Sequence, residues 1–148
     1  MELWFYHLER TPLDKVLPGL LEKSLDKDWR VLICSGHVDR LQWLDEWLWT
    51  WRDDSFIPHG TADTPRADLQ PVLLTSGTEN ENNAKVAILL DGADPANFEG
   101  LERAIVMFDG ADGDAVQQAR QFWKQAKKKQ QTVLYWKQNE SGTWKNLA

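Results

Sequence analysis

One aromatic and several basic side chains recur at helical spacing near the C-terminal end of the chain. Val116, Arg120, Trp123 and Lys127 are three or four positions apart, with Lys124 alongside, so they share one face if this segment is a helix. An arginine guanidinium is planar and can hold a carboxylate with two hydrogen bonds. The row therefore predicts a pocket for an acidic peptide that ends in an apolar side chain.

The same residues also have explanations that involve no ligand. Tryptophan is highly buried on average, so Trp123 could complete the buried face of the helix. The lysines at 127–129 are expected at a helix C-terminus, where positive charge interacts favourably with the helix dipole. The sequence leaves both interpretations open.

Patterns typical of catalytic and cofactor-binding sites are missing from the sequence. A phosphate loop needs closely spaced glycines, but residues 7–12 contain none, and residues 35–37 are not followed by Lys-Ser or Lys-Thr. Ser35 lacks the preceding glycine of a nucleophile elbow. The three histidines are scattered, with no cysteine or histidine at metal-ligand spacing. We therefore expect no catalytic residue, no cofactor and no metal.

Two apolar runs end in Asp-Gly, at residues 91–92 and 109–110. An aspartate after a strand can be a metal ligand beside a bound phosphate. Because the chain has no phosphate loop, we interpret both pairs as turns.

Charge is unevenly distributed along the 148 residues, which carry a formal net charge of −6. Residues 1–114 contain 10 basic and 22 acidic side chains, whereas residues 115–148 contain 7 basic and 1 acidic. The net acidity argues against a protein that coats nucleic-acid backbone with its whole surface. The basic C-terminal segment is still suited to an acidic partner.

Short apolar runs alternate with helical periodicity in the first part of the chain. We expect strands over 3–6 and 29–34, a helix over 13–25 with Thr11 as its N-cap, and a second helix over 37–50. Such alternation implies parallel strands joined by right-handed crossovers. The inner face of the second helix is expected to contain Val38, Leu41, Leu44, Leu48 and, as a further candidate, Trp47.

The remaining elements complete an α/β pattern. Residues 50–70 have little periodicity and are expected to be mostly loop, and residues 114–129 form the clearest helix. Further strands are expected at residues 71–75, 86–90, 104–108 and 132–136. The inward stripe of the 114–129 helix is expected to be Ala115, Ala119, Phe122 and Ala126. The sequence thus predicts a single three-layer α/β domain over residues 1–148, with a mostly parallel sheet and no phosphate loop.

The location of the protein is predicted from what the sequence lacks. Cys34 is the only cysteine and lies in the apolar run 31–34, so we interpret it as a buried, inert thiol. The N-terminus has no signal-peptide pattern, and no apolar stretch approaches the about 18 residues of a membrane span. We expect a cytoplasmic protein with no membrane contact.

Several segments together match the pattern of a known family. Residues 44–49 read Leu-Asp-Glu-Trp-Leu-Trp and residues 54–60 read Asp-Ser-Phe-Ile-Pro-His-Gly, which match its D-x-x-LW and SFIPH segments. The FYHL strand at 5–8, the A-R-x-x-[YW]-K helix at 119–124 and the TWK segment at 143–145 are consistent with it. The sequence resembles the chi subunit of the bacterial DNA polymerase III holoenzyme from end to end.

The resemblance implies an accessory protein and not an enzyme. Chi proteins have a small α/β fold similar to nucleotide-binding domains. They link the clamp loader to single-strand DNA-binding protein by gripping the acidic C-terminal tail of that protein, which ends in Pro-Phe. They also bind the small psi subunit where the bacterium has one. The resemblance therefore implies that this chain contacts DNA only indirectly.

The resemblance also assigns residues to two binding surfaces. Val116 is a departure, because the family has a basic residue there, and Lys127 or Lys128 could supply the missing charge. Trp49 and Phe56 match aromatic positions that bind the psi subunit or other protein partners. The residues assigned to the acidic-tail surface are Val116, Arg120, Trp123, Lys124, Lys127 and Lys128.

Two other functions remain as alternatives. The basic segment with its tryptophans could bind single-stranded nucleic acid directly, with bases stacked on indole rings. An enzyme built on a doubly wound sheet would need an unusual cofactor. Separate titrations with an oligonucleotide and with an acidic peptide ending in Phe distinguish a nucleic-acid-binding module from an adaptor, and nucleotide binding would support the enzyme.

Overall fold

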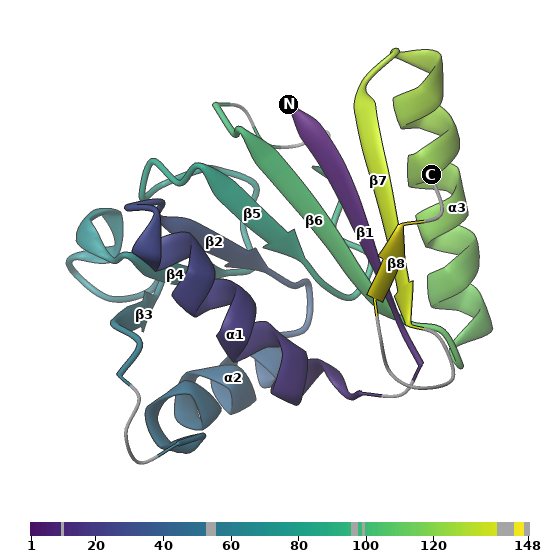
Figure 1. The fold of residues 1–148 in the computed structure, drawn as a ribbon. Helices are drawn as coiled ribbons and strands as arrows, with labels where there is room; N and C mark the ends of the chain where they lie inside the picture. The colour runs from purple at the N-terminus through teal and green to yellow at the C-terminus, as the bar shows by residue number, and fades with distance from the viewer. Residues whose placement is uncertain (10, 53–55, 96–97, 99, 139–143, 147–148) are drawn as a thin grey trace.

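An eight-stranded sheet forms the centre of the computed structural model, which describes the chain except for residues 10, 53–55, 96–97, 99, 139–143 and 147–148 (Figure 1). The strands lie in the order β3-β4-β2-β5-β6-β1-β7-β8. Neighbouring strands are parallel, except that β8 is antiparallel to β7. Their bounds are β1 Glu2–Leu8, β2 Val31–Cys34, β3 His59–Thr61, β4 Val72–Thr75, β5 Val86–Leu89, β6 Arg103–Asp109, β7 Thr132–Gln138 and β8 Trp144–Asn146.

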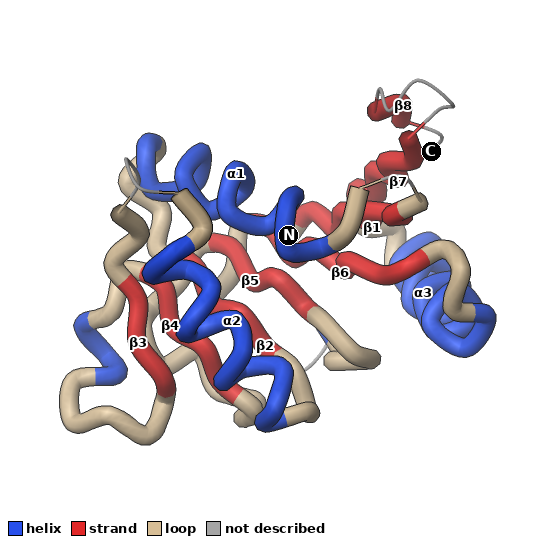
Figure 2. The backbone as a smooth tube through the Cα atoms, turned by 90° about the horizontal axis from the view of Figure 1, so that it is seen from below, coloured by secondary structure: helices blue, strands red, loops and turns tan. Residues whose placement is uncertain are grey.

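Helices cover both faces of this sheet. Helices α1 (Leu13–Asp26) and α2 (Val38–Thr50) pack on one face, and α3 (Gly113–Lys128) packs on the other, beside the edge that contains β7 (Figures 1 and 2). A 3-10 helix, η1 (Ala67–Leu69), precedes β4. The predicted three-layer α/β fold with a mostly parallel sheet is confirmed. No helix in the described ranges is both long and apolar enough to cross a membrane.

The central strands are apolar on both sides because helices or loops cover both faces. Every residue of β2, β4 and β5 is buried, which explains why these strands appear in the sequence as continuous apolar runs. The side chains divide into two cores, one facing α3 and one facing α1 and α2. Cys34 at the end of β2 is 5% exposed, which confirms the predicted buried thiol.

The order of the strands differs from the order of the elements in the chain. Strands β1 and β2 are parallel, but β5 and β6 lie between them. The segment 50–70, expected to be mostly loop, contains the three-residue strand β3 at one edge of the sheet as well as η1. Strands this short carry too little periodicity to be found from sequence alone.

Two local predictions are wrong. Val38 is 56% exposed, because it is the first residue of α2 and lies roughly a quarter turn around the axis from Leu41, Leu44 and Leu48. Thr11 does not cap α1, whose N-cap is Pro12 without a side-chain hydrogen bond. The Thr11 hydroxyl instead accepts a hydrogen bond from Nε2 of Gln138 in β7, at 3.1 Å.

A tryptophan compensates for the proline inside α1. Pro18 has no N–H, so the carbonyl of Asp14, four residues earlier, lacks the hydrogen bond that a regular helix would give it. The indole Nε1 of Trp47 in α2 donates to that carbonyl at 2.8 Å. This bond joins α1 to α2 and satisfies the carbonyl that Pro18 leaves without its helical donor.

We expect Trp47→Phe to lower the free energy of unfolding by roughly 1–2 kcal/mol, because it leaves the Asp14 carbonyl without this donor. Urea denaturation measures the change. Trp43→Phe is the matched control, since Trp43 is 45% exposed and stacks on Trp47 with ring centroids 5.7 Å apart. Equal losses in the two variants would contradict the compensating role of Trp47.

Candidate functional site

Helix α3 is held in place by a side-chain cap at its N-terminus and by buried side chains along its inner face. The Asp112 carboxylate caps it by accepting hydrogen bonds from the backbone N–H groups of Asp114 and Ala115, at 3.1 and 3.3 Å. The buried residues of its inner face confirm three members of the predicted stripe, and Ala115 is partly buried. The three buried residues are Ala119, Phe122 and Ala126.

The outer side of α3 carries the predicted aromatic and basic row. Val116 and Trp123 are half-buried and pack against the core that faces α3, whereas Arg120 and Lys124 are exposed. The Nζ of Lys127 lies 5.4 Å from the centre of the Trp123 ring. Trp123 is thus partly a core residue, and the rest of its ring is open to solvent beside the exposed cations.

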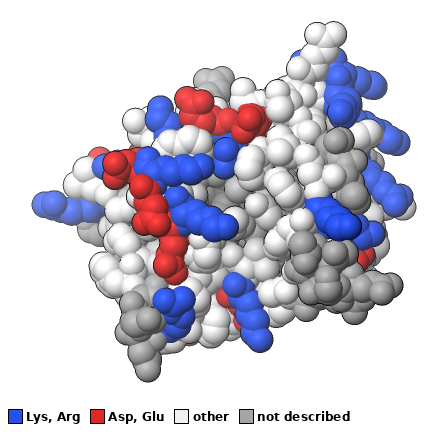
Figure 3. Space-filling view, viewed as in Figure 1, with Lys and Arg blue, Asp and Glu red and all other residues white. Residues whose placement is uncertain are grey.

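The cations of this row have no acidic partner in the described part of the chain. The described ion pairs of the protein lie elsewhere, between other residues. Figure 3 shows Lys and Arg side chains following the side of the molecule formed by α3 and β7. The exposed cations of the row are Arg120, Lys124, Lys127 and Lys128. Carboxylates of a partner could therefore reach these side chains without displacing an internal ion pair.

Tyr135 in β7 extends this surface and was missed in the sequence. Its hydroxyl lies 2.8 Å from Nδ1 of His7, and its ring, like that of Trp123, packs against the core that faces α3. Burial raises the pKa of Tyr135, and the nearby charge of Arg120 acts in the opposite direction. The alternation of Val133, Tyr135 and Lys137 along β7 was the signal that could have placed Tyr135 on the α3 side.

His7 connects Tyr135 to a charged pair at the end of β1. Its Nε2 lies 3.2 Å from the Glu9 carboxylate, which also pairs with Lys137 at 3.4 Å. The backbone of Gly110 passes so close that a Cβ there would lie 2.1 Å from the His7 Nε2. A larger residue at position 110 would therefore have to displace this imidazole.

We expect acidification below about pH 6.5 to destabilise the protein through His7. Burial lowers the pKa of His7, and the opposing effect of Glu9 does not cancel this. The unfolded chain then binds the proton first, so stability is lost as pH falls from the unfolded pKa through the folded one, by at most about 1.4 kcal/mol per pH unit.

Urea denaturation across this pH range measures the effect. In His7→Gln the dependence should become flatter, whereas His37→Gln, a change at an exposed histidine, should retain it. An unchanged pH dependence in His7→Gln would contradict the assignment.

The second predicted surface lies at the other edge of the sheet, near β3. Trp49 is 50% exposed and Phe56 is 72% exposed, with ring centroids 5.8 Å apart. The buried His59 ring lies 4.1 Å from the Trp49 ring and is held by the carbonyls of Ile57 and Asp45, at 2.7 and 2.9 Å. The structure therefore places Trp49 and Phe56 side by side near the β3 edge of the sheet, whereas α3 packs beside β7 near the other edge (Figure 1).

The structure brings no metal-ligand cluster together among the residues it describes. Asp91 and Gly92 form a turn after β5 with φ values of 53° and 83°, as predicted. The Asp91 carboxylate accepts hydrogen bonds from Ser35 at 2.6 Å and from Arg40. Burial alone would raise the pKa of Asp91, but these bonds outweigh it and lower the pKa.

Comparison with known proteins decides the family. The sequence pattern of the family described as DNA polymerase III chi subunit, HolC, matches residues 1–133, which include α2 and all of α3. The chain belongs to the DNA polymerase III chi subunit family. The resemblance seen in the sequence is thereby confirmed, and this chi-family chain is an accessory subunit of a replicative polymerase.

A curated relative agrees with this assignment. The protein named "Probable DNA polymerase III subunit chi" from Rickettsia prowazekii (strain Madrid E) is 26% identical to this chain over 152 residues. The alignment covers 97% of this chain and 90% of the relative. The similarity to a chi subunit therefore includes both predicted surfaces, the row on α3 with Trp123 and the pair Trp49 and Phe56.

Proposed function

We propose that this chain links the clamp loader to single-strand DNA-binding protein by binding the acidic C-terminal tail of that protein along α3. The observation that carries the proposal is the row of exposed cations beside the half-buried Trp123 ring. Arg120 would hold a tail carboxylate through its planar fork, and Lys124 would contact a second one. The terminal Phe of the tail would pack near Trp123, between α3 and β7.

The energetics favour a division of roles between the apolar and charged parts of the surface. Burial of one aromatic ring of about 150–250 Å² contributes roughly 4–6 kcal/mol before ordering costs. A micromolar complex needs about 8 kcal/mol. The ring therefore supplies much of the affinity, whereas the exposed cations speed the encounter and set the register of the tail.

In this proposal Lys127 extends the row, and it does not stand in for the basic residue that the resemblance implies at the position of Val116. These two positions are 11 residues apart, which is about 16 Å along a helix axis. A cation at Lys127 would therefore meet a different part of the tail. Val116 contributes apolar surface at the other end of the row, where it already packs against the core.

Trp49 and Phe56 are proposed to bind the second protein partner, a psi subunit or another clamp-loader component. Both rings are exposed and adjacent, as expected for aromatic anchors at an interface. Helix α2 contacts β3 at one edge of the sheet, whereas α3 contacts β7 near the other. Two partners can thus bind at the same time, which an adaptor requires.

Titration of the full chain while tryptophan fluorescence is recorded tests the proposal. We expect an acidic peptide ending in Pro-Phe to change the emission of Trp123 and to bind far more tightly than a single-stranded oligonucleotide. Rising salt should weaken the peptide complex without abolishing it, because screening removes the charge contribution and leaves the apolar one. Tighter binding of the oligonucleotide would favour direct nucleic-acid binding instead.

A further inference from the structure

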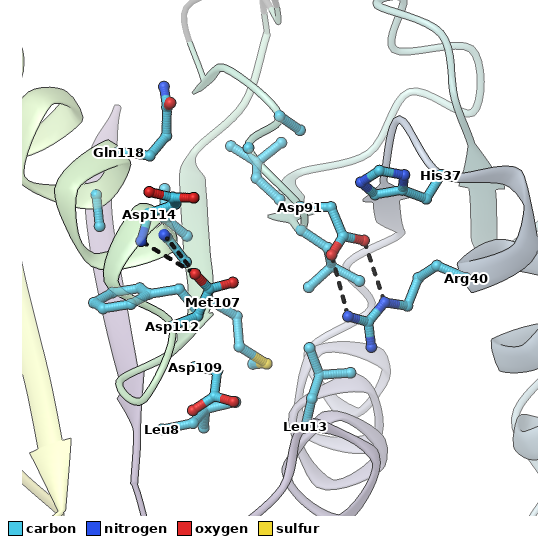
Figure 4. A pocket seen from close by; sticks show the side chains of 18 of the residues that line it. Leu8, Leu13, His37, Arg40, Asp91, Met107, Asp109, Asp112, Asp114 and Gln118 are labelled. Atoms are coloured by element: carbon cyan, nitrogen blue, oxygen red, sulfur yellow. Dashed lines mark hydrogen bonds and ion pairs between the residues drawn. The ribbon is translucent and has the colours of Figure 1, made fainter.

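A cleft of about 760 Å³ opens at the carboxyl ends of β5, β6 and β1 (Figure 4). The N-terminal ends of α1, α2 and α3 surround it, so residues far apart in the chain meet there. Its volume is that of an ordinary ligand site, and such sites lie at this end of parallel sheets. Buried apolar side chains line its floor, among them Leu90, Val106, Met107 and Phe122.

The positive charge on one wall of the cleft is already neutralised. Arg40 in α2 donates to both carboxylate oxygens of Asp91, from Nη2 at 3.1 Å and from Nε at 3.2 Å. Ser35 donates to the same carboxylate at 2.6 Å. This wall therefore offers little net charge to a ligand.

The opposite wall carries an excess of carboxylates. Figure 4 shows Asp109, Asp112 and Asp114 across the cleft from Asp91 and Arg40. Asp14 at the start of α1 also lines the cleft. Among the described residues, no cation forms an ion pair with any of these four carboxylates. The field of this wall attracts a cation and repels an acidic peptide.

The rim adds an exposed aromatic ring. Trp43 lines the cleft and is 45% exposed, with its ring stacked on Trp47. A ligand that carries only charge would leave this ring and the apolar floor unused. The combination matches a peptide with a basic side chain and an apolar side chain close together.

We propose that this cleft binds a basic, partly apolar segment of a partner protein. A Lys or Arg side chain of the segment lies against Asp109 and Asp114, and an apolar side chain packs between Trp43 and the floor. The ligand has the opposite charge to the acidic tail proposed for α3, so this site is a separate one. It gives the adaptor a third docking surface.

Calorimetric titration of the full chain with the peptide acetyl-Lys-Leu-Arg-Leu-Lys-amide at low ionic strength tests the proposal. The peptide should bind, and the double variant Asp109→Asn, Asp114→Asn should bind it about tenfold more weakly. Asp26→Asn, Asp68→Asn is the matched control, because both residues are exposed and neither lines the cleft. The control should keep an affinity within about twofold of the unaltered chain.

Two further probes separate the apolar contribution from charge alone. Spermidine and the peptide acetyl-Glu-Leu-Glu-Leu-Glu-amide should both bind much more weakly than the basic peptide, and Trp43→Ala should weaken the basic peptide further. Equal affinity for spermidine, an unchanged affinity in the cleft double variant, or no binding of the basic peptide would overturn the proposal. Circular dichroism confirms that each isosteric variant is folded.

Discussion

Arg120→Ala should weaken binding of an acidic peptide ending in Pro-Phe by roughly 10- to 100-fold, because a hydrogen bond to a charged group contributes about 1.5–3 kcal/mol. Arg120 is exposed on α3 and has no ion pair among the described residues, so its removal should leave the fold intact. Calorimetric titration gives the affinity and thermal unfolding gives the stability.

Two further variants show whether the guanidinium itself is recognised. Arg120→Lys retains the charge but loses the planar fork, so it should bind with intermediate affinity. Arg66→Ala removes an exposed arginine beside η1, at a distance in the fold from α3, and should bind like the unaltered chain. Full affinity in a folded Arg120→Ala variant would show that the tail binds elsewhere.

Phe5→Ala should lower the free energy of unfolding by roughly 3–5 kcal/mol, because it leaves a cavity in the core under α3. Phe5 is fully buried in β1, between β6 and β7, and its ring stacks on Tyr135 with centroids 5.8 Å apart. Urea denaturation measures the loss. The fold depends on this ring more than on any exposed aromatic side chain described above.

Phe56→Ala removes the same side chain at a position that is 72% exposed, so its effect on stability should stay within about 0.5 kcal/mol. It should instead weaken binding of the partner proposed for the Trp49 surface. Similar losses of stability at Phe5 and Phe56 would contradict the division between core and binding surface on which the proposed function depends.

Much of the fold could be predicted from sequence because local patterns specify it. The stripe of Ala119, Phe122 and Ala126 is local, and so are the apolar runs of β2 and β5. The order of strands is not local, since β1 contacts β6 and β7 only after the chain has crossed the sheet. The capping of α1 also failed for a non-local reason, because Gln138 engages the Thr11 hydroxyl from β7.

In the candidate site too, local features could be predicted from the sequence and non-local ones could not. Arg120, Trp123 and Lys127 lie on one helix, so their spacing was enough to predict a shared surface. Tyr135 and His7 come from different strands, and no local pattern joins them. The carboxylates of the cleft likewise converge from several elements, and in the sequence the pair at 109–110 indicates only a turn.

The most direct test of the account is to map the acidic peptide on the full chain by nuclear magnetic resonance. We predict that the largest shifts occur at the backbone amides of Arg120, Trp123 and Lys124 and at the indole N–H of Trp123. The amides around Trp49 should not move. Shifts centred on Trp49, or none on α3 at saturating peptide, would contradict the proposal that α3 binds the tail.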